Sequence, residues 1–175
     1  MLSRSRGLPL LIMVVLALSG CTATALPDAT PPGDGVTTSE PDVQIAGQTA
    51  AEFTELLVRA TNVARAEAGL SELDLSECAL PFAARRAEDL IGAPALEHAS
   101  LHDLSQACAL SGQITGENLI RGIGTPSEFT EAWLNSPGHR ANLLNPNFLA
   151  GAISCVIDHN EAGEPQWLCS HLFVG

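Results

Sequence analysis

The sequence predicts an α+β domain in which a late antiparallel pair of strands follows a series of helices. Two observations predict it: apolar residues recur at helical spacing from Phe53 onward, and residues 166–174 alternate between two faces. The length of 175 residues suits one domain once the ends are set aside. We therefore expect a domain over residues 48–175 with helices on both faces of its sheet.

Residues 1–20 have the features of a signal peptide for export. Arg4 and Arg6 precede an apolar run over residues 8–18, which is shorter than the roughly 20 residues of a membrane span. The Leu-Ser-Gly-Cys that ends at Cys21 is similar to the bacterial lipobox, whose cysteine is lipidated after cleavage. We expect Cys21 to anchor the protein to the outer face of the cell membrane. An ordinary secretory signal with a chance cysteine, giving a secreted protein, is the alternative.

Residues 21–47 are predicted to begin with the lipidated cysteine and to continue as a disordered tether. The segment after Cys21 holds Ala, Thr, Pro, Gly and Asp, with hardly a large apolar side chain. Such a composition cannot bury enough surface to offset the entropy of ordering the chain. An anchor, a tether and then a folded domain form a consistent arrangement.

Two amphipathic helices open the domain. The first is expected to end at Gly69, because glycine suits the left-handed conformation that terminates helices. The second is expected after Ser76, a candidate N-cap, and to end at Gly92. Residues 73–75 are expected to be a connector between them. The apolar positions at helical spacing are Phe53, Leu56, Leu57, Ala60, Ala64, Leu80, Ala83, Ala84, Ala87 and Ile91.

Shorter elements are expected in the middle of the chain. These are a loop over residues 97–100, a short helix over 101–108 and a strand over 117–120. A capping box at Thr125 and Glu128 then begins a further helix. Pro137 and Gly138 are expected to end that helix.

The last two strands are predicted to pair as an antiparallel hairpin. Residues 149–157 are rich in small and β-branched residues, and a turn-rich segment separates them from residues 166–174. We expect His171, like Trp133, to be a packed side chain. The two faces of the final strand are Trp167, Cys169, His171 and Phe173, and Leu168, Ser170, Leu172 and Val174.

The charge of the chain excludes nucleic acid as a partner. All 20 acidic residues follow Cys21, whereas only six arginines do, and the chain has no lysine. Nucleic-acid binding requires a basic face against the phosphates. The acidic character is most simply explained by solubility.

Four cysteines remain after Cys21, and an even number in an exported chain indicates two disulfides. Cys78, Cys108, Cys155 and Cys169 allow three pairings. We favour Cys78–Cys108 and Cys155–Cys169, because each pair is close in sequence and the second would cross-link one hairpin. A metal cluster is the alternative, although no Cys-x-x-Cys spacing supports it.

An ordered set of short motifs resembles the bacterial branch of the CAP superfamily, also called the SCP-like or cysteine-rich secretory, antigen 5 and pathogenesis-related-1 family. The motifs are Asn62 and Arg65 before Gly69–Leu70, His98, Gly116–Glu117–Asn118, Trp133, Ser136–Pro137–Gly138–His139–Arg140–Ala141–Asn142–Leu143, and Phe173–Val174–Gly175. The resemblance covers roughly residues 54–175. It implies an α-β-α sandwich with a small antiparallel sheet, here in a lipoprotein.

The resemblance also implies a cleft that carries two histidines and two glutamates. His98 and His139 match the histidines, and Glu117 matches the glutamate of the Gly-Glu-Asn motif. Ser136 stands where many eukaryotic members have the second glutamate, and Glu131 on the same helix is the candidate substitute. The residues expected to support the cleft are Asn118, Glu131 and Ser136.

A divalent metal is the cofactor that this residue set suggests. Two imidazoles and a carboxylate can bind Zn²⁺, and family members are known to bind divalent metal through the histidine pair. We expect Zn²⁺ or another divalent metal on His98, His139 and Glu117. The alternative role of Glu117 is to brace a histidine.

Three functions fit these observations. The first is an extracytoplasmic binding module whose cleft holds a small apolar or envelope-derived ligand, without catalysis. The second is a metal-dependent hydrolase of peptide or cell-wall bonds with Glu117 as general base, against which the missing second glutamate counts. The third is a protein-interaction module at the cell surface that uses its acidic face.

Overall fold

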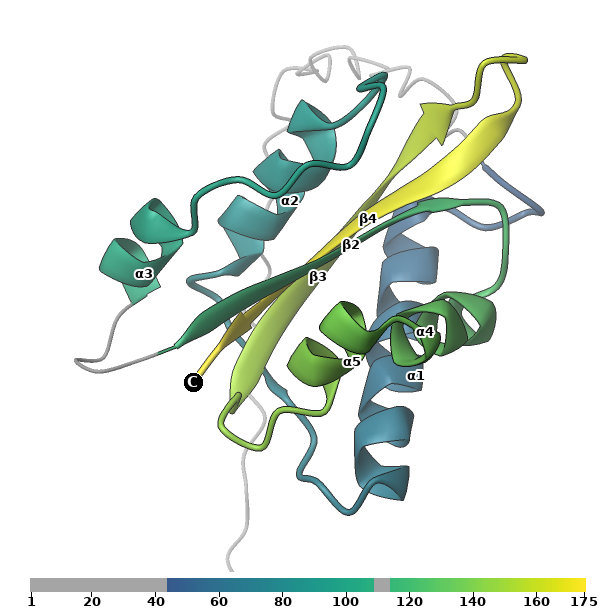
Figure 1. Ribbon diagram of the computed structural model, residues 1–175. Coiled ribbons are helices and arrows are strands. Elements are labelled where there is room, and N and C mark those ends of the chain that lie inside the picture. The colour runs from purple at the N-terminus through teal and green to yellow at the C-terminus, as the bar shows by residue number, and fades with distance from the viewer. Residues whose placement is uncertain (1–43, 109–113) are drawn as a thin grey trace, which may run out of the picture. The chain divides into compact units, whose positions relative to one another are not determined.

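The computed structural model describes residues 44–108 and 114–175, and Figure 1 shows how their elements are arranged. The predicted signal peptide and most of the predicted tether lie outside these residues. In the described part of the chain, no helix is both long and apolar enough to cross a membrane. The elements in chain order are α1 (Ala50–Glu67), β1 (Asp74–Leu75), α2 (Leu80–Asp89), α3 (His102–Cys108), β2 (Thr115–Gly122), α4 (Pro126–Asn135), α5 (Pro137–Leu143), β3 (Ala150–His159) and β4 (Pro165–Val174).

The sheet has the strand order β1-β3-β4-β2. The predicted hairpin is confirmed as the antiparallel pair β3–β4, and β2 pairs antiparallel with the other edge of β4. The expected all-antiparallel sheet needs one correction, because β1 pairs parallel with β3. The connector expected at residues 73–75 contains this strand, which backbone bonds hold: Asp74 N–H donates to Leu149 O and Ser76 N–H donates to Gly151 O.

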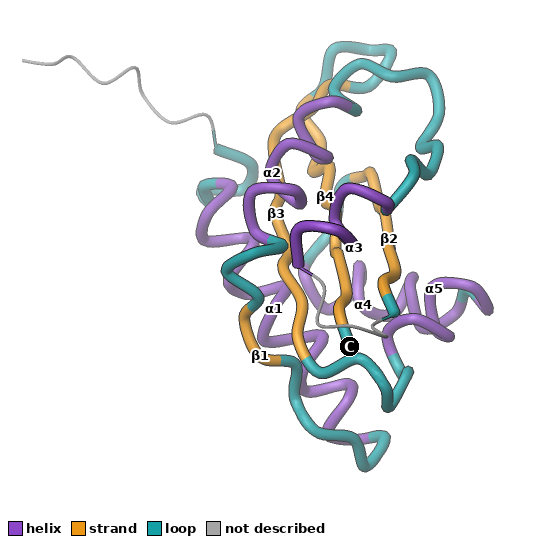
Figure 2. Tube along the Cα trace, turned by 90° about the vertical axis from the view of Figure 1, so that its left-hand side faces the viewer, coloured by secondary structure: helices purple, strands orange, loops and turns teal. Residues whose placement is uncertain are grey.

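Helices cover both faces of the sheet, as predicted. α1, α4 and α5 lie on one face, and α2 and α3 lie on the other (Figure 1 and Figure 2). On the first face, the Phe53 ring of α1 stacks on Trp167 of β4 with centroids 4.3 Å apart, and it meets Phe129 of α4 at 5.3 Å. On the second face, Ala83 of α2 packs in one cluster with Leu172 of β4. The alternation predicted for β4 is therefore confirmed.

Local chemistry begins the helices, with one correction at α2. The capping boxes at Thr49 and Thr125 begin α1 and α4, since each hydroxyl accepts a hydrogen bond from the N–H three residues on. Ser76 does not cap α2 directly. The helix begins at Leu80, and the Ser76 hydroxyl accepts from the N–H of Ala79 in the turn before it.

A second correction concerns Pro137, which ends one helix and also begins the next. Ser136 is extended, with φ −96° and ψ 119°, and it separates α4 from α5. Proline disfavours the helical conformation of the residue before it, yet its own φ suits the first helical position. The predicted stop is therefore a helix–helix junction, and it places His139 on the first turns of α5.

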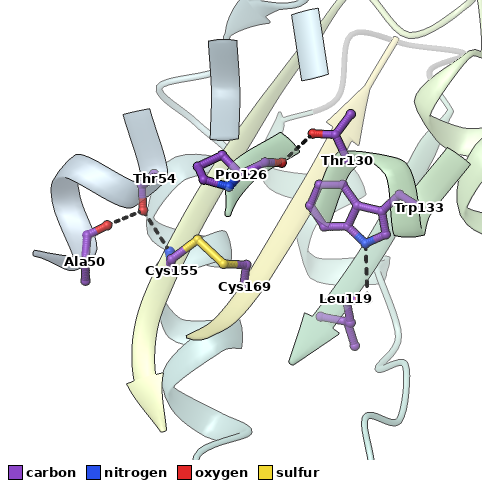
Figure 3. Close-up of a disulfide and its surroundings, with 8 residues drawn as sticks. All are labelled: Ala50, Thr54, Leu119, Pro126, Thr130, Trp133, Cys155 and Cys169. Atoms are coloured by element: carbon purple, nitrogen blue, oxygen red, sulfur yellow. Dashed lines mark hydrogen bonds between the residues drawn. A yellow bond between two sulfur atoms is a disulfide. The ribbon is translucent and has the colours of Figure 1, made fainter. Parts of the chain in front are cut away.

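Both favoured disulfides are confirmed. Cys78–Cys108 joins the turn before α2 to the end of α3. Cys155–Cys169 joins facing residues of β3 and β4, and the N–H of Cys155 donates to Thr54 Oγ1 of α1 at 3.1 Å (Figure 3). Because disulfides form and persist in oxidising compartments, the two bonds indicate an exported protein.

Candidate functional site

Glu117 is the buried carboxylate at the centre of the candidate site. Its side chain on β2 is 2% exposed. Oε1 accepts a hydrogen bond from Arg86 Nε of α2 at 2.7 Å, and Oε2 accepts from His98 Nδ1 at 2.6 Å. A buried carboxylate requires partners that replace its hydration. Here both of its oxygens are engaged by side chains.

Side chains of the Gly-Glu-Asn motif contact helices on both faces of the sheet, because successive residues of a strand point to opposite faces. Glu117 points toward α2, whereas the Asn118 Nδ2 donates to the carbonyl of His139 on α5 at 2.9 Å. Asn142 of α5 donates to Glu117 O and to Asn118 Oδ1, each at 3.0 Å. These amide bonds hold the start of α5, and with it His139, against β2.

Gly116 allows this close approach between β2 and its neighbours. A Cβ atom at this position would lie 2.8 Å from Phe148 Cζ and 3.1 Å from Asn142 Oδ1. The phenyl ring is itself buried and stacked on Phe173, so it has little room to move. The glycine of the motif is therefore required by packing.

His98 presents one ring nitrogen to solvent. Its side chain is 58% exposed, and because the Glu117 carboxylate only accepts hydrogen bonds, Nδ1 must carry the proton. In the neutral ring, Nε2 then has its lone pair free for a ligand. Arg86 also fixes this loop, since its Nη2 donates to the carbonyl of Glu97.

The loop that leads to His98 is anchored at its start by a second buried ion pair. Arg121 Nε on β2 lies 2.9 Å from Asp158 Oδ2, and the same guanidinium donates to Leu90 O at 2.7 Å and Ala93 O at 2.6 Å. Asp158 Oδ1 accepts from the N–H of Gly92 at 3.0 Å. The segment between α2 and His98 is thus tied to the sheet by charge-assisted bonds.

His139 is half-buried and favours its neutral form. Burial lowers the pKa of His139 below its usual value, and positive charge on His98 lowers it further. His98 is held by the Glu117 carboxylate, and His139 is held by the hydrogen bond from Asn118 to its carbonyl.

The structure brings some of the predicted site residues into contact and leaves others apart. His98 and Glu117 are in direct contact, and Asn118 connects the strand to His139. Ser136 is the extended residue between α4 and α5, and its side chain makes no capping hydrogen bond. Glu131 is exposed on α4 and forms no ion pair with any residue that the structure describes. Its role as the substitute glutamate stays a prediction.

Sequence reasoning missed Arg86 and Asn142. The sequence signal for Arg86 was the small number of cations, since only six arginines follow Cys21. In the structure the Arg86 side chain is 15% exposed, and a cation that is this buried needs an anionic partner. Asn142 belongs to the Ser-Pro-Gly-His segment, but its role depends on α5 packing against β2. Neither contact follows from local spacing.

A zinc centre with three protein ligands does not fit this arrangement. Such centres use three side chains and leave one position open, whereas Glu117 has both oxygens committed to Arg86 and His98. In the described part of the chain, no group of three or more His, Cys, Asp or Glu side chains is arranged to hold a metal ion. Two imidazoles, one of them braced by Glu117, are the donors of the predicted set that remain.

The hollow beside Glu117 has a volume of about 270 Å³. Charged side chains contribute much of its lining, among them Arg86, Asp89 and Asp103 together with Glu117 itself. Such a lining suits a polar ligand better than an apolar one, because uncompensated charges lose hydration against apolar surface. Neither His98 nor His139 is among the residues that line this hollow.

Comparison with known proteins identifies relatives of this arrangement. The family model described as CAP, the cysteine-rich secretory protein family, matches residues 58–171. The Bacillus subtilis (strain 168) protein YkwD is 33% identical over 132 residues, which is 73% of this chain and 49% of YkwD. The chain thus spans about half the length of this curated relative.

Solved structures share the fold at low sequence identity. A cysteine-rich secretory protein from Staphylococcus aureus subsp. aureus Mu50 aligns with a TM-score of 0.59 and 17% identity, covering 79% of this chain and 43% of the other. An extracellular protein containing an SCP domain from Bacillus anthracis str. Ames aligns with a TM-score of 0.56 and 20% identity, covering 76% and 45%. An outer surface protein of Borrelia burgdorferi aligns with a TM-score of 0.54 and 21% identity, covering 73% and 95%.

Proposed function

Because this chain belongs to the CAP family of cysteine-rich secretory proteins, we propose that it is an extracytoplasmic binding module without hydrolytic activity. His98 and His139 hold a divalent cation such as Zn²⁺ in the cleft. An oxygen-bearing component of the cell envelope is the ligand that completes the coordination. The observation that carries this proposal is the double engagement of Glu117 by Arg86 and His98.

Glu117 acts in this proposal as a brace. A carboxylate that accepts from the Nδ1–H of a histidine orients the ring and raises the basicity of Nε2, as is common behind metal-binding histidines. The neutral imidazole is the form that binds a cation, and burial favours that form at His139. A bound divalent cation would supply positive charge that attracts carboxylate, phosphate or sugar oxygens of an envelope component.

The same contacts argue against the hydrolase. A general base must accept a proton from water within hydrogen-bond reach, and Glu117 can do so only by releasing Arg86 or His98. Its side chain is 2% exposed, so water approaches it poorly. Ser136 also stands in place of the second glutamate that many eukaryotic members of the family have at this position, which counts against the hydrolase.

A hydrolysis assay tests the proposed function. The purified protein is incubated with Zn²⁺ and either casein or cell-wall peptidoglycan, with a chelator and Glu117→Gln as controls. We expect release of soluble fragments no greater than in the chelated sample, because both oxygens of Glu117 are engaged and cannot accept a proton from water. Zn²⁺-dependent release that disappears in Glu117→Gln would overturn the binding module in favour of the hydrolase.

We further propose that Cys21 carries a lipid anchor, so that the cleft is held near the membrane. The support is the Leu-Ser-Gly-Cys motif behind a short apolar run, in residues outside those that the structure describes. Changing Cys21 to Ser is expected to move the protein from the membrane fraction to the medium, because acyl chains anchor by burying methylenes. Immunoblotting of both fractions checks this, and an unchanged distribution would exclude lipidation at Cys21.

A further inference from the structure

The two disulfides differ in how accessible they are to an external thiol. Cys155 and Cys169 are 5% and 0% exposed, and they join the two central strands of the sheet. Cys78 is exposed in the turn before α2, and Cys108 is half-buried at the end of α3. Exchange begins when a thiolate attacks one sulfur of a disulfide, so its rate depends on access to that sulfur. Cys78–Cys108 is therefore the disulfide that an external thiol can attack while the protein is folded.

Among the residues that the structure describes, no hydrogen bond ties α3 to the rest of the domain. Figure 1 and Figure 2 show α3 at the margin of the fold, beside α2. The hydrogen bonds of residues 99–108 stay inside the segment: the Ser105 N–H donates to Leu101 O, and the His102 N–H donates to Ser100 Oγ. The helix is thus held in place by side-chain packing and by the disulfide.

The packing of α3 depends on one apolar cluster. Leu104 is 2% exposed and packs with Ala83 of α2 and Leu172 of β4. Leu101 and Cys108 are half-buried against this cluster, and the other side chains of α3 are exposed or half-buried. A helix of seven residues is not stable by itself in water, and one buried leucine offsets little of the entropy that the segment loses on ordering. The cross-link is therefore the main restraint on α3.

The chain on either side of this segment is held independently of the disulfide. His98 Nδ1 is bonded to Glu117 before the segment, and after it Ile114 exchanges two backbone hydrogen bonds with Gly175. β2, β3 and β4 keep their pairing without any contribution from α3. Release of Cys108 is therefore expected to free α3 and to leave the sheet intact.

The hollow of about 270 Å³ beside Glu117 lies between the two elements that the disulfide joins. Leu101, Asp103 and Leu104 line it from the segment that includes α3, and Phe82 lines it from α2. Since α3 forms part of the wall, its release would open the hollow. The redox state of Cys78–Cys108 therefore controls access to this face of Glu117.

We propose that Cys78–Cys108 is a site of thiol–disulfide exchange, at which an exported protein with a dithiol active site releases α3 and opens the hollow beside Glu117. A thiolate of the dithiol attacks the exposed Cys78 Sγ, the bond between the two sulfurs breaks, and Cys108 leaves as a thiolate that takes up a proton. The second thiolate of the partner then attacks the partner's own sulfur in the mixed disulfide, and Cys78 leaves in the same way. The dithiol is oxidised to a disulfide as the two cysteines are reduced, and the protons that it loses equal those that they gain.

Graded reduction of the folded protein tests the exchange site. The purified full chain is treated with dithiothreitol in the presence of a chelator, so that the result does not depend on the proposed cation site. Free thiols are blocked with iodoacetamide and located by mass spectrometry. We expect Cys78 and Cys108 to be labelled together, and Cys155 and Cys169 to be labelled only in urea that unfolds the protein.

A Cys-x-x-Cys protein in which serine replaces the second cysteine tests which sulfur is attacked. Because such a protein cannot complete the exchange, it should be trapped as a mixed disulfide on Cys78. Reduction of both disulfides at the same rate, no labelling of Cys78 in the folded protein, or trapping on Cys108 alone would overturn the proposed exchange at Cys78.

Hydrogen exchange tests whether reduction releases α3. In Cys78→Ser/Cys108→Ser, amides of residues 102–108 should exchange about 100-fold faster than in the oxidised wild type, the effect of removing one loop-closing cross-link. Reduced wild type should match this variant, and amides of β3 and β4 should be unchanged in both.

Leu104→Ala is the matched control, because it removes the main apolar contact of α3 and keeps the disulfide. Its α3 amides should exchange more slowly than those of the double cysteine variant. Three outcomes would each overturn the proposal: unchanged exchange in α3 after reduction, an equal increase throughout β3 and β4, or exchange in oxidised Leu104→Ala as fast as in the double cysteine variant.

Discussion

Replacing Arg86 by alanine is expected to lower the free energy of unfolding by about 3 kcal/mol, because it leaves the buried carboxylate of Glu117 without its cation. The Arg86 Nε lies 2.7 Å from Glu117 Oε1, and both side chains are largely buried. His98 cannot substitute for it, since that side chain is more than half exposed. Urea denaturation of the purified variant at neutral pH measures the loss.

Arg85→Ala is the matched control for this substitution. Arg85 is the neighbouring residue of α2, its side chain is 82% exposed, and its Nε lies 3.9 Å from Asp89. We expect its removal to change stability by less than about 0.5 kcal/mol. Glu117→Gln in the Arg86→Ala background should recover part of the loss, because it removes the uncompensated charge. Strictly additive effects of the two changes would show that the pair is not coupled.

His171 should make the protein sensitive to acid well above the range of its carboxyl groups. Burial, and then the positive charge of Arg65, lower the pKa of His171 from 6.5 to about 3. Between these pH values the unfolded chain binds a proton at this residue and the folded chain does not. Stability therefore falls as the pH falls, by about 1.4 kcal/mol per pH unit.

Comparing wild type with His171→Gln isolates this contribution. Glutamine keeps a polar side chain at the site but does not titrate, and all other groups, including His139, remain in both proteins. Urea denaturation from pH 6 to pH 4 should give a steeper decline for the wild type, with the two curves converging in slope above pH 7. Parallel curves over the whole range would mean that His171 titrates with the same pKa in the folded and the unfolded chain.

The periodic elements could be predicted from the sequence because their burial pattern is local. Apolar spacing defines α1, alternation defines β4, and the capping box at Thr125 defines where α4 begins. The disulfide between β3 and β4 was favoured because its cysteines are close in sequence and the predicted hairpin would bring them together. These features depend on contacts within one element or between sequence neighbours.

Other features depend on contacts that sequence spacing does not encode. β1 has two residues, too few for a pattern, and it exists because β3 offers backbone partners from residues about 75 positions later in the chain. The role of Arg86 depends on Glu117, 31 residues away. Pro137 reads locally as a stop, and only the seven residues of α5 packed on β2 show that it is also a start.

The candidate site, too, could be predicted only in part. Motif matching selected His98, Glu117 and His139, and the structure brings Glu117 against His98. Motif matching could not decide whether Glu117 is a metal ligand or braces a histidine, because that depends on which atoms its two oxygens meet. The sequence also could not show that His171 Nδ1 lacks a hydrogen-bond partner among the described residues. A packed histidine and a ligand-binding one have the same alternation in the sequence.

Titration of Zn²⁺ into the purified protein by calorimetry tests the cation site most directly. Wild type is compared with His98→Ala/His139→Ala, with Glu117→Gln, and with His102→Ala/His159→Ala, a control in which two exposed histidines are removed. We predict one bound ion in the wild type and the control, and none in the cleft double variant. Glu117→Gln should retain the ion with affinity about 10- to 100-fold weaker, as expected for a brace. Equal binding by the cleft double variant, or no binding by the wild type, would contradict a cation held by His98 and His139.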